Sequence, residues 1–282
     1  VRSASKFMSF SIDPQTGKLK LISSIPAGGN AAYIATDKSG GYLFSAYYGE
    51  GKVAVHRLGK QGEILEEILQ TIPTAKNAHA ILPDQNNQFV FVPHTGPNAI
   101  YQFLWDEKQG VLKENTPPRL SAAAGLEPRH LAVSQDNRFL YFDNEKGSSV
   151  TAYKLNPETG TLSAFQTVST LPDEFKGNNT CADIELSPSG DYLYASNRGH
   201  NSIACFAVDQ QTGRLKSFGQ AATEDTPRSF NIDPTGRFLY AAGQKNGKLA
   251  AYKISPEDGT LERFATYEVG KSPSWVEIVK FP

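Results

Sequence analysis

Two kinds of short segment in this chain combine charged, amide and imidazole side chains that could support chemistry. One kind precedes an apolar stretch and comprises Asn77-Ala78-His79, Pro128-Arg129-His130, Asn178-Asn179-Thr180-Cys181-Ala182-Asp183 and Pro227-Arg228-Ser229-Phe230. The other kind follows an aromatic stretch and comprises Asp143-Asn144-Glu145-Lys146, Asn197-Arg198-Gly199-His200 and Gly243-Gln244-Lys245-Asn246. Brought together, these side chains would form a polar site for an anion, because guanidinium groups offer paired donors to carboxylates and phosphates.

Each of these residues also has a purely structural interpretation. Arg129 and Arg228 could pair with carboxylates between neighbouring repeats. His79 and His130 could be hydrogen-bonded packing residues, and Glu145 could be a solvated loop acid. Residue type alone leaves both interpretations open.

Signatures of other chemistries are missing from the sequence. The histidines are not spaced as a metal triad, and no acid-rich loop resembles a calcium site. The chain has no nucleophile-elbow motif, phosphate-binding loop or dinucleotide fingerprint. We therefore expect neither a metal nor a cofactor.

A repeat of about fifty residues organises the chain. Its clearest part is a strand of aromatic and aliphatic residues, whose central aromatics are Tyr42, Phe89, Phe139, Tyr192 and Phe238. The steps between them are 47, 50, 53 and 46 residues. Each unit also carries a preceding strand, a third strand and a tight Asp- and Gly-containing turn before a fourth strand, as in Asp209-Gln210-Gln211-Thr212-Gly213. Four short strands per unit predict an all-β fold of β-propeller blades.

The predicted domain is a single β-propeller over residues 1–282, with five complete four-stranded blades and a partial terminal blade. Residues 1–29 are expected to supply a third and a fourth strand at 6–12 and 19–25, and residues 273–279 one first strand. We expect the two ends to lie side by side, since propellers commonly close by combining strands from both termini. Their incomplete set of strands leaves two possibilities: the last blade has three strands, or about one further repeat is missing from the N-terminus.

Blade topology then places the polar segments. In a blade, the loop after the second strand and the link between blades lie on one face, whereas the tight turns lie on the opposite face. Both kinds of polar segment are therefore expected to converge at one mouth of the central channel.

Composition narrows the partners. The formal net charge of −1 predicts no binding to nucleic acid, and no apolar run is long enough to predict a membrane span. The only cysteines, Cys181 and Cys205, are expected to be free buried thiols, which favours a cytoplasmic location. We expect a monomer or a weak homo-oligomer.

The whole chain resembles the lactonase family of seven-bladed β-propellers, and the resemblance is most specific in the second half. It implies that the chain lacks about one blade of the family pattern at its N-terminus. The resemblance rests on Pro128-Arg129-His130, Asn144-Glu145, Ala182-Asp183-Ile184, Asn197-Arg198, Pro227-Arg228-Ser229-Phe230 and Ala241-Ala242-Gly243-Gln244-Lys245. The family includes cycloisomerase-like 6-phosphogluconolactonases and the related carboxy-cis,cis-muconate cyclases. The resemblance implies hydrolysis of 6-phosphogluconolactone to 6-phosphogluconate, a step of the pentose phosphate pathway. The implied ligand is a small anionic sugar lactone.

The resemblance also implies site residues. The family's candidate histidine, two arginines and glutamate correspond to His79, Arg129, Arg198 and Glu145, which are the predicted catalytic residues. The predicted substrate-binding residues are His130, Arg228, Asp183 and Gln244.

The chemistry expected of this set is activation of water. Glu145 could take the proton from water, and Arg129 and Arg198 could stabilise the oxyanion or hold a phosphate. His79 could orient water or donate to the ring oxygen. Two other functions stay open at this stage: a muconate-type lactonising cycloisomerase and a non-enzymatic binding platform.

Overall fold

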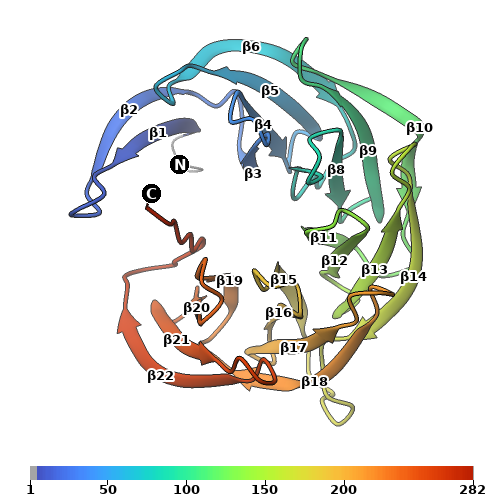
Figure 1. Ribbon diagram of the computed structural model, residues 1–282, viewed down its shortest axis with the longest axis vertical. Helices are drawn as coiled ribbons and strands as arrows, with labels where there is room; N and C mark the ends of the chain where they lie inside the picture. Colours follow the sequence, from blue (N-terminus) through green and yellow to red (C-terminus); the bar gives the residue numbers. More distant parts are fainter. Residues whose placement is uncertain (1–4, 282) are drawn as a thin grey trace. The chain divides into compact units, whose positions relative to one another are not determined.

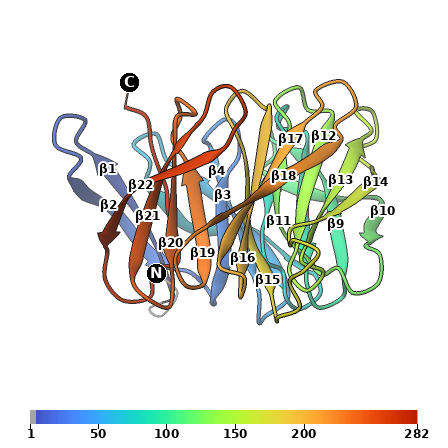
Figure 2. The same ribbon diagram turned by 90° about the horizontal axis from the view of Figure 1, so that it is seen from below.

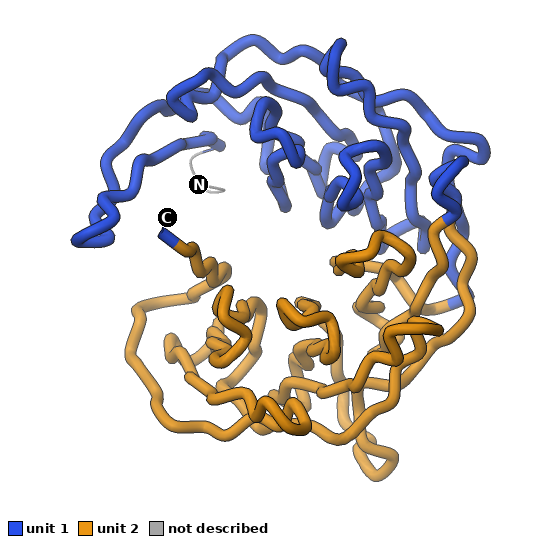
Figure 3. The backbone as a smooth tube through the Cα atoms, in the orientation of Figure 1, with its two compact units in different colours: residues 1–124, 156–161, 281–282 blue, residues 125–155, 162–280 orange. Residues whose placement is uncertain are grey.

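The computed structural model describes residues 5–281, and every regular element among them is a β-strand. These strands form two compact units, which Figure 3 colours separately. Unit 1 comprises residues 1–124, 156–161 and 281–282, and unit 2 comprises residues 125–155 and 162–280. No helix among the described residues is long and apolar enough to cross a membrane.

Unit 1 contains one two-stranded sheet and two four-stranded sheets, all antiparallel (Figure 1). The small sheet pairs β1 (Lys6–Ile12) with β2 (Leu19–Pro26), which confirms the two strands predicted in this region. The larger sheets are β3 (Ala31–Thr36), β4 (Tyr42–Tyr47), β5 (Lys52–Leu58) and β6 (Ile64–Pro73), and β7 (Leu82–Pro83), β8 (Phe89–His94), β9 (Ala99–Asp106) and β10 (Val111–Ser121).

Unit 2 contains three four-stranded sheets, whose strands lie side by side in chain order (Figures 1 and 2). They are β11 (Pro128–Val133), β12 (Phe139–Asn144), β13 (Ser149–Leu155) and β14 (Leu162–Ser169); β15 (Thr180–Leu186), β16 (Tyr192–Arg198), β17 (Ser202–Val208) and β18 (Leu215–Ala222); and β19 (Pro227–Ile232), β20 (Phe238–Gly243), β21 (Lys248–Ile254) and β22 (Leu261–Glu268). The innermost strands β11, β15 and β19 are in contact in that order.

The second strands of the four-stranded sheets contribute much of the buried core. Every residue of β12 is buried, as is every residue of β4 and β8. In unit 2, Tyr141 of β12 packs in one cluster with Leu193 and Phe206 of the next sheet. A strand buried on both faces needs a nearly continuous apolar run, and this is the feature that made the repeat visible in the sequence.

Glycines of the tight turns connect adjacent sheets. In the turn that Asp209 opens, Gly213 has a φ of +69°, and a Cβ added there would lie 2.5 Å from the ring of Phe139. The Gly213 carbonyl accepts a hydrogen bond of 3.0 Å from the Tyr141 hydroxyl. Gly259 repeats the arrangement one sheet further on, against Tyr192 and the Tyr194 hydroxyl. The turn therefore requires glycine both for its backbone conformation and for the close approach of the ring.

The C-terminal segment differs from the prediction. Residues 273–279 form no strand, so the predicted first strand there is wrong. The segment follows β19 through side chains instead: the Val276 amide donates to Ser229 Oγ and the Ile278 amide to Asn231 Oδ1, both at 3.1 Å. Because side chains of β19 accept these bonds, no backbone ladder forms.

The five four-stranded sheets confirm the predicted all-β propeller repeat within the described residues. The closure of the two ends and the single-domain organisation stay predictions, and residues 1–4 of the predicted N-terminal segment lie outside the described residues.

Replacing Gly213 by Ala should test the connection between sheets. Gly236 is the control, because its φ is +72° but an added Cβ there lies no closer than 3.4 Å to its neighbours. Both variants carry the strain of a left-handed alanine, about 1–2 kcal/mol, and only Gly213→Ala adds overpacking of about 1–3 kcal/mol. Gly213→Ala should therefore have the lower midpoint of thermal unfolding. Equal midpoints would show that the Phe139 contact contributes nothing.

Candidate active site

The candidate site is built on β-bulges at the start of the innermost strands of unit 2. Regular pairing with the second strand is interrupted between Pro128 and Leu131 of β11, between Cys181 and Ile184 of β15, and between Pro227 and Ser229 of β19. Each interruption holds one extra residue. A bulge bends its strand and changes the direction of its side chains, so the polar residues of all three links occupy positions that a regular ladder would not give them.

A strained residue fixes the start of two of these strands. Glu127 and Thr226, directly before β11 and β19, have φ values of 59° and 60°, a conformation uncommon for residues other than glycine. The carbonyl of Glu127 accepts from the Glu145 amide at 2.8 Å, and that of Thr226 accepts from the Gln244 amide at 2.9 Å. These hydrogen bonds hold Glu145 beside the bulge of β11 and Gln244 beside the bulge of β19.

The structure brings Arg129, Glu145 and Arg198 together. Glu145 Oε1 lies 2.7 Å from Arg198 Nη2, and Glu145 Oε2 lies 3.5 Å from Arg129 Nε. Arg198 Nη2 also donates to the Cys181 carbonyl at 2.9 Å. The side chains of Glu145 and Arg198 are 24% and 15% exposed, whereas Arg129 is only 1% exposed. Glu145 and Arg198 are therefore accessible, and Arg129 supports them from a buried layer.

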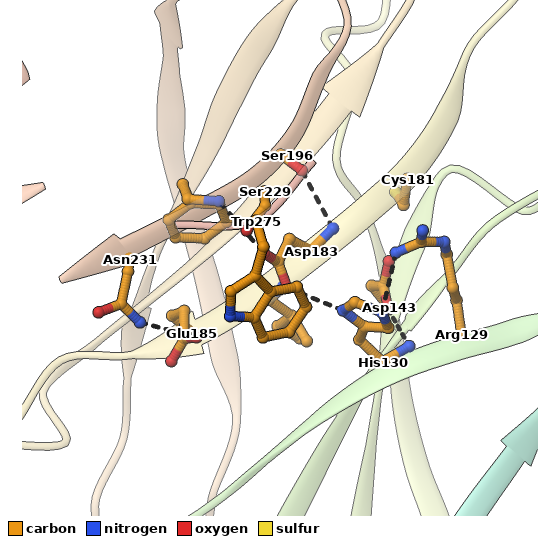
Figure 4. A network of polar contacts seen from close by, with 12 residues as sticks. Arg129, His130, Asp143, Cys181, Asp183, Glu185, Ser196, Ser229, Asn231 and Trp275 are labelled. Carbon is orange, nitrogen blue, oxygen red and sulfur yellow. Dashed lines mark hydrogen bonds and ion pairs between the residues drawn. The ribbon is translucent and has the colours of Figure 1, made fainter. Parts of the chain in front are cut away.

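His130 and Asp183 belong to the buried layer (Figure 4). His130 Nδ1 lies 2.8 Å from Asp183 Oδ1, and His130 Nε2 lies 3.1 Å from Arg129 Nη1. Burial, together with the charges of Arg129, Arg228 and Arg198, lowers the pKa of His130 well below its ordinary value. The imidazole is therefore neutral, and its contact with Asp183 is a hydrogen bond to a carboxylate rather than a pair of full charges.

Asp143 is the site residue that sequence reasoning did not assign. Its Oδ1 accepts from the His130 amide at 2.6 Å, while its Oδ2 is buried without a hydrogen-bond partner among residues 5–281. Burial raises the pKa of Asp143 to about 7, although the charge of Arg129 acts in the opposite direction. The available signal was a carboxylate directly after the apolar run Phe139–Phe142 and still within β12.

The remaining predicted residues are placed as follows. Arg228 occupies the bulge of β19, and its charge lowers the pKa values of Arg129 and His130. Gln244 follows β20 beside Thr226. His79 belongs to unit 1, where its amide donates to the Pro93 carbonyl at 3.0 Å and its ring meets that of Tyr48 edge-on. His79 therefore lies in unit 1, whereas Arg129, Glu145 and Arg198 lie in unit 2.

The cysteines do not supply a nucleophile. Cys181 and Cys205 are both free and buried, which confirms the sequence prediction. Burial raises the pKa of each thiol to about 12, so neither forms a thiolate at neutral pH.

Four-stranded antiparallel meanders of this kind, repeated along the chain, are the blades of a β-propeller, and here one group of blades carries a charged, partly accessible cluster. The family model "Lactonase, 7-bladed beta-propeller" matches residues 2–278, and the chain belongs to this family.

Relatives extend the comparison. The chain is 34% identical over 279 residues to a 6-phosphogluconolactonase of Serratia proteamaculans, covering 99% of this chain and 83% of that protein. It is 35% identical to one of Erwinia tasmaniensis, with the same coverage. Among solved structures, the periplasmic gluconolactonase of Pseudomonas aeruginosa superimposes with a TM-score of 0.90 at 27% identity, over 98% of this chain and 81% of that one.

Replacing Asp143 by Asn should change how stability depends on pH. An acid whose pKa is raised on folding keeps its proton in the folded state between about 4 and 7 and loses it in the unfolded state. Its contribution to the free energy of unfolding therefore falls as pH rises through that window, by an amount on the order of a few kcal/mol. Asp143→Asn should show a smaller loss of thermal stability from pH 5 to pH 8 than the unmodified protein.

The control for this prediction is Asp173→Asn, because Asp173 is exposed. It should keep the original pH dependence. The assignment fails if Asp143→Asn also keeps it.

Proposed function

We propose that this protein hydrolyses 6-phosphogluconolactone to 6-phosphogluconate. The observation that carries the proposal is an accessible carboxylate, Glu145, held between two guanidinium groups. The family membership and the names of the relatives support it. A lactone is an internal ester, so its hydrolysis needs a water, a proton acceptor and positive charge near the developing oxyanion.

In the proposed reaction, Glu145 takes the proton. Water adds to the lactone carbonyl carbon, its proton passes to the Glu145 carboxylate, and a tetrahedral oxyanion forms. The bond between that carbon and the ring oxygen then breaks, and the proton held by Glu145 goes to the ring oxygen. Glu145 fits this role because Asp143 and Asp183 are almost inaccessible. His79 stays a predicted participant.

Arg198 and Arg228 are the proposed contacts for anionic groups. Both retain some exposure, whereas Arg129 is buried. A guanidinium can give two parallel hydrogen bonds to a phosphate, or stabilise an oxyanion. Arg129 adds its positive charge from beneath without a direct contact to the sugar.

The proposal also specifies that the lactone substrate carries a phosphate group. A phosphorylated lactone would suit the three arginines, and a substrate of that charge agrees with the predicted cytoplasmic location. The structural similarity to a periplasmic gluconolactonase makes the unphosphorylated lactone the natural competitor. Comparing turnover of 6-phosphogluconolactone, gluconolactone and muconolactone decides between them. The lactonase proposal is wrong if none is hydrolysed, and muconolactone turnover alone would indicate the cycloisomerase.

Glu145→Gln should lower kcat for the preferred lactone by about 10²–10⁴-fold, the usual contribution of general acid–base catalysis. The amide keeps the size of the side chain but cannot take the proton. Glu127→Gln is the matched control, since Glu127 is a partly exposed glutamate that meets Lys146, and it should retain activity. Near-normal kcat in Glu145→Gln would remove Glu145 as the base.

Arg198→Lys tests the proposed anion contact. Lysine keeps the positive charge but lacks the planar pair of donors. We expect KM for 6-phosphogluconolactone to rise more than KM for gluconolactone if Arg198 contacts the phosphate. Equal changes for both lactones would place Arg198 at the reacting carbonyl.

A further inference from the structure

A line of hydrogen bonds runs through equivalent positions of the three bulges in unit 2. His130, Asp183 and Ser229 occupy the same place in β11, β15 and β19, as the pairing with each second strand shows. His130 Nδ1 meets Asp183 Oδ1 at 2.8 Å, and Asp183 Oδ2 accepts from the Phe230 amide at 3.1 Å. Asp183 therefore connects β11 to β19 across β15 (Figure 4).

The contact with Arg129 determines the tautomer of His130. A guanidinium has only donors, so His130 Nε2, 3.1 Å from Arg129 Nη1, must be the acceptor and carry the lone pair. The proton of the neutral ring is then on Nδ1, where it is donated to Asp183. An imidazolium, or the opposite tautomer, would set two donors against each other at Nε2.

We propose that Asp183 and His130 are positioning residues for Arg129: Asp183 holds His130 as the Nδ1–H tautomer, and the Nε2 lone pair of His130 then fixes the guanidinium beneath Glu145. Neither residue needs to touch the substrate. Both are almost fully buried, which fits a supporting role better than the substrate contact predicted from the sequence.

The geometry around Arg129 explains why such support matters. Its Nε faces Glu145 Oε2 at 3.5 Å without forming a hydrogen bond, so the hydrogen bond to His130 is the directional contact that orients the group. A displaced guanidinium would move positive charge away from the Glu145 carboxylate. The effect on the reaction rests on the proposed function, whereas the tautomer does not.

The first test is the ¹⁵N spectrum of the imidazole side chains. The chain has five histidines, and the signal lost in His130→Gln identifies His130. We expect the unmodified protein at pH 7 to show a neutral ring with its proton on Nδ1. Both oxygens of Asp183 also accept from backbone amides, Oδ1 from Ile184 at 3.2 Å and Oδ2 from Phe230 at 3.1 Å. In Asp183→Asn, an amide oxygen facing His130 is a weaker acceptor than the carboxylate, and an NH₂ group facing His130 forces the proton to Nε2. The population of the Nδ1–H form should therefore fall. A proton on Nε2 in the unmodified protein, or an imidazolium, overturns the inference.

Kinetics give the second test. Asp183→Asn should lower kcat for the preferred lactone by up to about 100-fold, which is the loss that a displacement of about 1 Å in the active site can cause, with a smaller effect on KM. His130→Gln keeps an acceptor for Arg129 and should retain a higher kcat than His130→Leu, which has none.

A double-mutant cycle separates positioning from a general effect on the fold. Glutamine has no tautomers, so Asp183→Asn should cost much less in the His130→Gln background than alone. Equal costs in both backgrounds would overturn the proposal. If Asp183→Asn does not fold, the spectrum of the unmodified protein still decides the tautomer. If the tautomer is as expected but the unmodified protein hydrolyses no lactone, the proposed function fails and the positioning of Arg129 stands.

Discussion

The buried charge of Arg129 is the constraint on which the site depends. A guanidinium that is 1% exposed loses its hydration and must be compensated by groups in the protein. Three neighbours supply this compensation: Glu145 at Nε, His130 at Nη1 and the negative charge of Asp143 in its ionised form. Since the group keeps a pKa of about 10, it stays charged at neutral pH. Burial of His130 and Asp143 themselves keeps the imidazole neutral and raises the pKa of the carboxyl group.

The bulges make this arrangement possible. Successive side chains of a regular strand point to opposite faces of the sheet, so neighbours such as Arg129 and His130 could not meet. The extra residue in β11 removes that alternation, and the two side chains lie 3.1 Å apart at their nitrogen atoms. The same irregularity in β15 and β19 places Asp183 and Arg228. A β-bulge at the same position in three successive sheets thus brings their side chains together in one site.

The role of the bulges explains which parts of the fold and of the site could be predicted from the sequence. Blades are visible because burial on both faces of β12 and its equivalents imposes a local apolar pattern. The approach of Glu145 to Arg129 follows from blade topology, because a link and a second-strand loop of one blade share a face. Bulges have no such signature. The protonation of Asp143 and His130 depends on their burial and on charges from other strands, such as Asp183 and Arg228, which lie far away in the sequence. The segment after Ser272 differs from the predicted strand because its partners on β19 are side chains.

The charge at the candidate site is positive, whereas the net charge of the whole chain is slightly negative. The whole sequence has a formal net charge of −1, yet Arg129, Arg198 and Arg228 act on one small region that also contains Glu145, Asp183 and Asp143. With a pKa of about 7, Asp143 is only partly ionised at neutral pH. Three guanidinium charges therefore exceed the carboxylate charges beside them. An excess of positive charge next to an accessible carboxylate suits an anionic ester, because it attracts the anion and stabilises the oxyanion that hydrolysis creates.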